Sequence, residues 1–344
     1  MRTVMTRLSL VRFLTLRYAD LLKAARTLAA IVLLSALGIA PAAAQAPYPT
    51  RPIHIVVPFP AGGPSDVLTR MMGERMAKDL GQPIVVDNRP GANTLIGAEL
   101  VAKAAPDGYT LLMAIDSTLV MNQYLYSHLP YDPIKDFAPV SLAAKNMGWL
   151  VVNASSPYKT ANDLVAKAKA APGKLNCGAG TITTKLTCFL FNDKLGIDTV
   201  LISFNGSANV AQGVLTGAAD FVFDGTAAEL PLIQAGNLRA LAKLDRRPFA
   251  PLPKLPALVD ATGVDLGDLS VWNGLVAPHG TPPAVVDRLS AEVRKVLGEP
   301  DLKAKAEAVG IYVVSSTPAE FTAFIQHEAA RWPAVVKKSG LHFD

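Results

Sequence analysis

Short runs of β-branched residues alternate with helical patterns along this chain, and this alternation restricts the fold more than any other feature. The run Ile53–Val57 predicts a strand. Apolar residues at three- and four-residue spacing from Val67 to Leu80 predict a helix. The elements expected in this part are strands at 53–57, 84–86 and 110–114 and helices at 66–80 and 95–104. Strands and helices in this order indicate parallel strands covered on both faces, which is an α/β fold.

The same alternation returns later in the chain with new material. A strand is expected at 149–152, and Thr160 with Asp163 forms a capping box that begins a helix through Ala171. A second capping box begins a long final helix at about 318–339. Short apolar runs predict further strands at 175–178, 200–202, 221–223, 238–244 and 271–277.

Local changes of pattern near residues 146–148 and 263–268 suggest domain boundaries. They predict a discontinuous first domain of residues 45–147 and 267–344 and a second domain of residues 148–266. With the end of the chain back in the first domain, the chain crosses between the domains twice. Such a hinge between two α/β domains makes a cleft that closes.

The first 44 residues have the pattern of an export signal. A basic region precedes an uncharged apolar run at 27–40, which as a helix spans about 21 Å, against about 30 Å for the bilayer core. Small residues at 42–44 follow, so we predict a signal peptide cleaved near Ala44 and Gln45 and a mature protein in the periplasm. An uncleaved N-terminal anchor is the alternative.

The charge of the chain belongs to this leader. The formal net charge is +5, but residues 1–44 hold six of the 33 basic and one of the 28 acidic residues, which leaves 27 of each. The predicted mature chain therefore offers no electrostatic basis for binding nucleic acid. Half of the 344 residues are hydrophobic and 18% are charged, which excludes a disordered protein.

The sequence contains none of the common catalytic motifs. The sequence has no GxSxG elbow, no HExxH and no P-loop lysine, and its five histidines are scattered. Because no nucleophile–base pair or metal-ligand set is found, we expect a protein that is not an enzyme and needs no cofactor or metal.

A glycine-rich loop is the most informative local feature. Gly62 and Gly63 follow the first strand and precede the first helix, although the third glycine of a dinucleotide motif is missing. Backbone N–H groups at the start of a helix suit a carboxylate or another small anion. The loop also lies at the carboxyl end of a parallel strand, where open α/β sheets bind ligands. An ordinary tight turn is the alternative for this loop. Asp66 is open to two roles, contact with a ligand amine or negative charge at the helix N-terminus.

Cys177 and Cys188 are the two cysteines, and export places them in an oxidising compartment. Their spacing fits neither a CxxC motif nor a zinc site. A disulfide and two separately buried thiols are both open, because spacing does not show whether the Cβ atoms are close enough.

A series of short motifs runs along residues 48–332. They are Tyr48-Pro49-x-Arg51-Pro52-Ile53, Val57-Pro58-Phe59-x-x-Gly62-Gly63-x-x-Asp66, Gly81-Gln82-Pro83-Ile84-Val85-Val86-x-Asn88-Arg89-Pro90-Gly91-Ala92, Gly97-Ala98, Pro106-Asp107-Gly108-Tyr109-Thr110-Leu111, Leu129-Pro130-Tyr131-Asp132-Pro133 with Asp136-Phe137, Ala235-Gly236-x-Leu238-Arg239-Ala240-Leu241-Ala242, Trp272-Asn273-Gly274-Leu275, Ala277-Pro278 with Gly280-Thr281-Pro282, and Glu328-x-x-x-Trp332. In order and density they resemble the periplasmic substrate-binding proteins of the tripartite tricarboxylate transporter family (TctC/Bug type). The resemblance covers essentially all of residues 48–344.

The resemblance implies a two-domain, type II periplasmic-binding-protein fold with a ligand cleft between the domains and no catalysis. It implies a monomer that captures a small carboxylate and delivers it to the membrane permease subunits of a tripartite tricarboxylate transporter. An orphan binding protein that presents its ligand to a sensor kinase is the alternative.

Site residues follow from the resemblance position by position. The first domain would contribute the loop after the first strand and the residues after the third: Phe59, Ala61, Gly62, Gly63, Ser65 and Asp66, then Asp116, Ser117, Thr118 and Asn122. The second domain would contribute Ala179, Gly180, Thr181, Thr183, Thr184, Phe204, Asn205, Gly206 and Asp224.

The chain departs from the family pattern at a few positions. Asn93-Thr94-Leu95 replaces a stretch that is usually richer in glycine. Lys185 stands where a histidine is common, and Asn205 where a Lys-Gly pair often begins. We expect Lys185 to be solvated, as most lysines are, with charge donated to an anionic ligand as the alternative.

Overall fold

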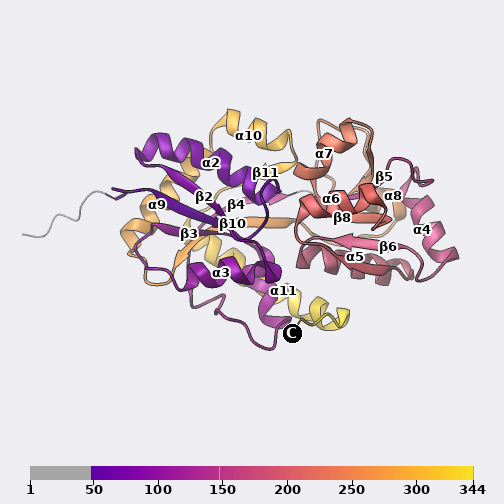
Figure 1. Cartoon of the computed structure of the whole chain (residues 1–344), viewed down its shortest axis with the longest axis horizontal. Helices are drawn as coiled ribbons and strands as arrows, with labels where there is room; N and C mark the ends of the chain where they lie inside the picture. The colour runs from indigo at the N-terminus through magenta and orange to yellow at the C-terminus, as the bar shows by residue number, and fades with distance from the viewer. Residues whose placement is uncertain (1–47, 147, 344) are drawn as a thin grey trace, which may run out of the picture. The chain divides into compact units, whose positions relative to one another are not determined.

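The computed structural model describes residues 48–146 and 148–343 (Figure 1). The predicted signal peptide and its cleavage site lie outside the described residues. Among the described residues, no helix is both long and apolar enough to cross a membrane.

Two β-sheets organise this part of the chain. The six-stranded sheet has the order β11-β4-β10-β3-β1-β2 and the five-stranded sheet the order β7-β6-β8-β5-β9. The first sheet consists of β1 (Ile53–Val57), β2 (Ile84–Asn88), β3 (Thr110–Ile115), β4 (Phe137–Asn146), β10 (Val271–Pro278) and β11 (Ile311–Val313). The second consists of β5 (Gly148–Asn153), β6 (Asn176–Ala179), β7 (Val200–Ser203), β8 (Phe221–Gly225) and β9 (Leu238–Lys243). Each sheet is the centre of one domain of an α/β fold.

Helices surround both sheets. Those that follow strands of the first sheet are α2 (Pro64–Leu80), α3 (Leu95–Ala102), α9 (Pro283–Leu297), α10 (Pro300–Glu307) and α11 (Pro318–Ser339). Those of the second are α4 (Ala161–Ala170), α5 (Ile182–Leu195), α6 (Ser207–Thr216), α7 (Thr226–Gln234) and α8 (Leu258–Thr262). Three short helical turns, η1 (Ala92–Thr94), η2 (Ser117–Met121) and η3 (Asn122–Tyr124), complete the chain order. The helices predicted from periodicity and capping boxes are confirmed within two residues at each end.

Strand direction follows chain connection. β1 is parallel to β2 and to β3, as the alternation of strand and helix predicts. β10 lies antiparallel between β3 and β4, and β5 lies antiparallel between β8 and β9. The chain passes from one sheet to the other between β4 and β5 and returns between β9 and β10, so Figure 1 shows both ends of the described chain around one sheet.

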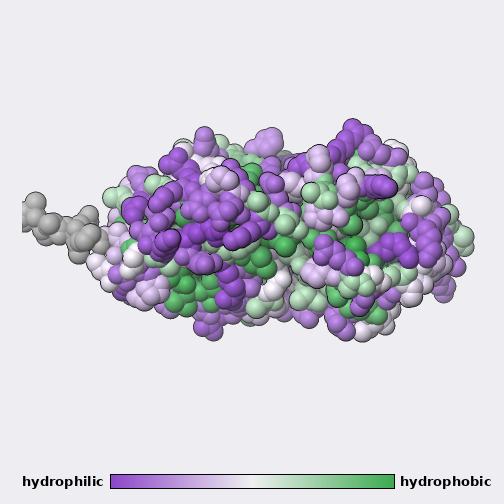
Figure 2. All heavy atoms as spheres, turned by 90° about the horizontal axis from the view of Figure 1, so that it is seen from above, coloured by the Kyte–Doolittle hydropathy of each residue, from purple (hydrophilic) through white to green (hydrophobic). Residues whose placement is uncertain are grey.

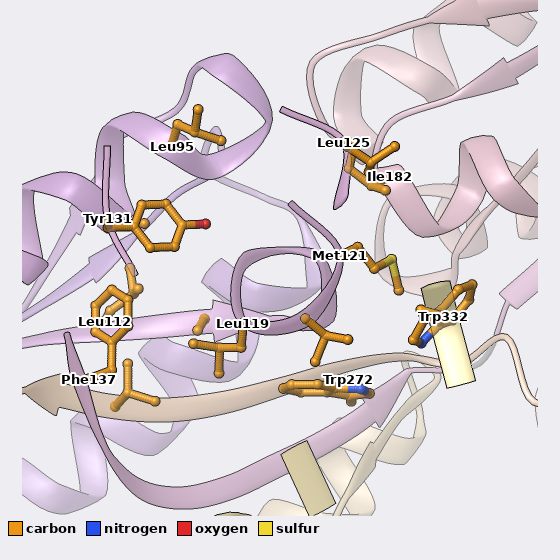
Figure 3. Packing of buried hydrophobic residues seen from close by; sticks show 14 of the residues in the cluster. Leu95, Leu112, Leu119, Met121, Leu125, Tyr131, Phe137, Ile182, Trp272 and Trp332 are labelled. Atoms are coloured by element: carbon orange, nitrogen blue, oxygen red, sulfur yellow. The ribbon is translucent and has the colours of Figure 1, made fainter. Parts of the chain in front are cut away.

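The buried hydrophobic residues form three clusters. Two of these clusters lie around the five-stranded sheet. The third cluster lies around the six-stranded sheet and also includes residues of the second domain. This third cluster includes Met121 and Trp332 and also Ile182 and Leu186 from α5 (Figure 3). One helix of the second domain therefore packs into the core of the first. Outside these clusters, hydrophilic residues are spread over the face seen in Figure 2.

Candidate binding cleft

A cavity of about 40 Å³ lies between loops of the two sheets. From the first domain it is lined by Phe59, Pro60, Gly63, Pro64, Ser65, Ile115, Asn146 and Val271. From the second it is lined by Thr181, Gly206, Ser207, Ala208 and Asp224. These residues stand at strand ends or in the first turns of helices, apart from the loop residues Phe59 and Pro60.

Two helices point uncapped N-termini at this cavity. α2 begins after Gly63 and α6 after Gly206, and neither N-cap residue makes a side-chain hydrogen bond to the helix. The first N–H groups of a helix have no partner within the helix, and the positive end of its dipole favours negative charge. One uncapped helix start from each domain thus meets at the cavity, and this arrangement suits a small anion.

The start of α5 differs from these two. Thr181 and Thr184 form a capping box, and Thr184 Oγ1 also accepts hydrogen bonds from the N–H groups of Gly180 and Thr181, at 3.1 and 3.0 Å. The N–H groups of Gly180, Thr181 and Thr184 are therefore already used by side chains of this third helix start, although Thr181 lines the cavity.

Asp66 stabilises the glycine-rich loop through hydrogen bonds and an ion pair. Its Oδ2 accepts a hydrogen bond from Gly62 N–H at 3.0 Å and its Oδ1 one from Asn88 Nδ2 at 3.0 Å, while Arg70 forms an ion pair with it at 2.9 Å. Burial tends to raise the pKa of Asp66, but the hydrogen bonds from Arg70, Gly62 and Asn88 outweigh it, and the pKa lies below its ordinary value. Gly62 has a φ of +90°, which favours glycine. Asp66 thus holds the glycine loop in shape and does not line the cavity.

Three polar side chains at the cavity are linked by hydrogen bonds. Asn146 Nδ2 donates to Asn273 Oδ1 at 2.7 Å, and Asn273 Nδ2 donates to Ser65 Oγ at 2.7 Å. Because Ser65 accepts from Asn273, its hydroxyl proton points elsewhere and is available as a donor.

The polar side chains that follow β3 form hydrogen bonds within the protein. Thr118 Oγ1 lies 2.8 Å from Thr94 Oγ1, and Tyr131 donates to the carbonyl oxygen of Thr118 at 2.8 Å. Asn122 Nδ2 donates to the Tyr131 hydroxyl at 3.0 Å. Asp116 accepts hydrogen bonds of 2.7 Å from Thr183 Oγ1 and from Ser117 N–H.

Lys185 corrects one expectation. It is buried, with 4% of its surface exposed, and its Nζ donates to Asn93 Oδ1 at 3.1 Å and lies 4.6 Å from the ring centre of Phe343. Burial lowers its pKa. The expectation of a solvated lysine is wrong, because α5 packs against the first domain at this point.

Of the residues assigned by resemblance, six line the cavity: Phe59, Gly63, Ser65, Thr181, Gly206 and Asp224. The others do not line it: Ala61, Gly62, Asp66, Asp116, Ser117, Thr118, Asn122, Ala179, Gly180, Thr183, Thr184, Phe204 and Asn205. The ring of Phe204 instead packs on Gly213, where a Cβ would lie 2.3 Å from it.

Seven residues that line the cavity were not predicted from the sequence: Pro60, Pro64, Ile115, Asn146, Ser207, Ala208 and Val271. Pro60, Pro64 and Ile115 are next to residues that the resemblance assigned to the site, so the same motifs could have indicated them. Asn146 and Val271 are paired across β4 and β10, and no local signal in the sequence joins them.

Cys177 and Cys188 form a disulfide, with Cα atoms 6.2 Å apart. The bridge links the start of β6 to the second turn of α5, and residues 179–184 lie within the loop that it closes. Thr181 is thereby held between two covalently joined elements. Within the described residues, no group of three or more His, Cys, Asp or Glu side chains is placed to hold a metal ion.

Comparison with known proteins agrees with this architecture. The family model described as the tripartite tricarboxylate transporter family receptor matches residues 68–341. The chain belongs to this receptor family. Its members are periplasmic solute-binding proteins, so the resemblance seen in the motifs and the two-domain fold that it implied are confirmed.

Relatives of this receptor family extend over nearly the whole chain. Protein BugT of Bordetella pertussis is 33% identical over 319 residues, which are 92% of this chain and 98% of BugT. The structure of R. palustris Rpa4515 with adipate is 32% identical, with a TM-score of 0.82 over 86% of this chain and 99% of that one. MatC (Rpa3494) from Rhodopseudomonas palustris with bound malate is 30% identical, with a TM-score of 0.78 over 84% and 100%.

Proposed function

We propose that this receptor captures a small carboxylate between the N-termini of α2 and α6 and delivers it to the membrane permease subunits of a tripartite transporter. The observation that carries the proposal is the meeting of two uncapped helix starts, at Gly63 and Gly206, in one cavity. Relatives with adipate and malate support the same ligand class.

The carboxylate would accept hydrogen bonds from backbone N–H groups near Gly63 and Ser65 on one side and near Ser207 on the other. Hydrogen bonds to a charged group contribute roughly 1.5–3 kcal/mol each. Since the donors come from both domains, a bound ligand stabilises the closed arrangement of the domains. The permease would then recognise this closed conformation.

The domain boundaries and the leader belong to the same proposal. Residues 45–147 and 267–344 would form one domain and residues 148–266 the other, hinged where the chain crosses between the sheets. The protein would act as a monomer, exported to the periplasm after cleavage near Gln45. N-terminal sequencing of the exported protein that finds residues before Ala40 would contradict the cleavage.

Calorimetry with a panel of mono-, di- and tricarboxylates tests the function, together with native mass spectrometry of protein purified without added ligand. We expect at least one carboxylate to bind with micromolar or tighter affinity. If no carboxylate binds and the purified protein carries a ligand of another class, the proposal is wrong. Uptake of the identified ligand is then measured in cells that lack the gene. Reduced uptake would support delivery to a permease, whereas unchanged uptake with a lost transcriptional response would favour the sensor role.

A further inference from the structure

A groove of about 820 Å³ lies in the second domain, apart from the cavity between the domains. It runs beside β9 and is bounded by the start of α4, the end of α7 and the segment 251–256. No residue lines both this groove and the cavity. The β9 groove is therefore a separate feature of the surface, which ligand binding between the domains does not explain.

The β9 groove contains the open edge of a sheet. β9 is last in the strand order, and β5 is the one described strand that pairs along its length. One end of the edge is covered, because Lys243 N–H donates to the carbonyl oxygen of Pro256 at 2.9 Å and Lys243 pairs with Ala257. Residues 238–241 line the groove instead. The outer edge of a strand presents backbone donors and acceptors with which another extended chain can pair.

One face of this edge is apolar. A buried hydrophobic cluster of the second domain reaches the groove here, and its members that line the groove are Leu238, Ala240, Ile233, Leu252 and Leu255. Leu252 and Leu255 come from the segment opposite β9 and are only partly buried. A side chain that lay on them would extend this apolar cluster and bury further apolar surface.

The other face of the edge is basic. Arg239 lies between Leu238 and Ala240 in the strand, so its side chain points to the opposite face. Its guanidinium donates to carbonyl oxygens of the loop 154–158, next to Lys159, which also lines the groove. Lys254 adds a third positive charge from the opposite segment.

These three cations have no counter-ion in the groove. Among the described residues, none of the three forms an ion pair. The residues that line the groove include no Asp or Glu. Asp163 is close in sequence, but it accepts hydrogen bonds from the backbone N–H groups of Lys159 and Thr160 and does not line the groove. The charge of the groove is therefore complementary to an acidic partner.

We propose that the β9 groove is a docking site for an extended, acidic segment of a partner protein, which pairs with residues 238–241 as an additional strand. Side chains of an extended chain alternate between two faces. Apolar side chains of the segment then lie on Leu252 and Leu255, and its carboxylates face Lys159 and Arg239. Backbone hydrogen bonds provide the affinity of such complexes, and the alternate side chains provide their specificity. This docking surface goes beyond the proposed function, because it does not depend on the ligand between the domains.

Synthetic peptides of about seven residues, the length of an ordinary strand, test the site by calorimetry. One peptide alternates valine with glutamate, and its control alternates valine with lysine. We expect the acidic peptide to bind at least about tenfold more tightly, because the lysine peptide meets charges of its own sign. Equal binding of the two peptides, or no binding of the acidic peptide at about 1 mM, overturns the inference.

Backbone methylation tests whether the peptide pairs with the strand edge. Two versions of the acidic peptide carry N-methyl groups, one on its valine amides and one on its glutamate amides. Since alternate N–H groups of a strand point to the same side, one version should bind at least about tenfold more weakly and the other should lose less. Hydrogen exchange should slow at residues 238–241 when the unmethylated peptide is bound. Unchanged binding of both methylated versions, or protection confined to other segments, overturns the inference.

Charge reversal then tests the basic side chains. The double variant Lys159→Glu with Lys254→Glu should bind the acidic peptide at least about tenfold more weakly. Lys167→Glu with Lys169→Glu makes the same change of charge on the exposed side of α4 and should bind it as the unmodified protein does. Equal affinity of the two double variants, both folded by circular dichroism, overturns the inference. The peptide comparisons use the unmodified protein, so they stand even if a variant does not fold.

Discussion

Thr183 Oγ1 donates a 2.7 Å hydrogen bond to Asp116 Oδ2, and this bond joins α5 of the second domain to the end of β3 in the first. Both residues are buried, with 0% and 1% exposed. Lys338 and Asp193 form a further link, an ion pair of 2.7 Å between α11 and α5. The face of α5 is therefore a contact between the domains, and the cavity lies beside it at the N-terminus of the same helix.

The buried Asp116 predicts a pH dependence of stability. Burial raises its pKa from 3.8 to about 7, while the hydrogen bonds from Thr183 and Ser117 act in the opposite direction. The folded state therefore keeps a proton that the unfolded state releases. This stabilisation is complete below about pH 4 and is lost as the pH rises to about 7, by at most about 4 kcal/mol.

Asp116→Asn should remove this part of the pH dependence between about pH 4 and about pH 7. Denaturant unfolding of the variant and of the unmodified protein at several pH values measures the difference, with Asp287→Asn as an exposed control. The same loss of stability between about pH 4 and about pH 7 in Asp116→Asn would show that Asp116 is not the group responsible.

Gly63→Val should abolish ligand binding without unfolding the protein. Gly63 has a φ of −81°, which valine adopts, and a Cβ at this position meets no atom within 4 Å. The added side chain stands at the start of α2 and denies the ligand access to the backbone N–H groups there. We expect a loss of affinity of at least 100-fold for whichever carboxylate is identified, by calorimetry.

Ala170→Val is the matched control for this variant, because it adds a similar side chain on the exposed side of α4. Its affinity should equal that of the unmodified protein. Affinity unchanged in folded Gly63→Val would place the ligand elsewhere.

Much of the fold was predictable because its signals are local. The capping boxes at Thr160 and Thr317 mark helix starts as the structure has them. β4 and β11 gave no such signal. β4 contains Pro139 and several small residues, and β11 is only three residues long, so both depend on pairing with distant strands.

The site was less predictable, because side-chain direction depends on packing between distant segments. The departure Asn93-Thr94 illustrates this. Ala92, Asn93 and Thr94 all have positive φ, the conformation for which glycine is the usual residue. The turn is held by the contacts of Thr94 with Thr118 and of Asn93 with Lys185. The sequence showed that glycine is missing, but not that a buried lysine of the other domain meets this turn.

Glu328→Ala should destabilise the protein by about 2–6 kcal/mol. Glu328 Oε2 accepts hydrogen bonds from the indole N–H groups of Trp272 at 3.4 Å and Trp332 at 3.3 Å. Removing the carboxylate leaves two buried donors without this acceptor, each at a cost of about 1–3 kcal/mol. Denaturant unfolding followed by tryptophan fluorescence measures the change. Glu328→Gln keeps an acceptor oxygen and should lose less, and exposed Glu74→Ala should lose nothing; equal losses in the alanine and glutamine variants would contradict this account.

The Cys177–Cys188 disulfide should contribute about 2–3 kcal/mol to the free energy of unfolding. The two residues are 11 positions apart, and closing a loop of this length restricts the unfolded chain by about that amount. Replacing both by alanine should lower the denaturant midpoint, and reductant should lower that of the unmodified protein. Reductant should leave the midpoint of the double variant unchanged, which makes this variant the control for other effects of the reagent. Titration of the denatured, unreduced protein should find no free thiol, and two free thiols would show that the bridge does not form.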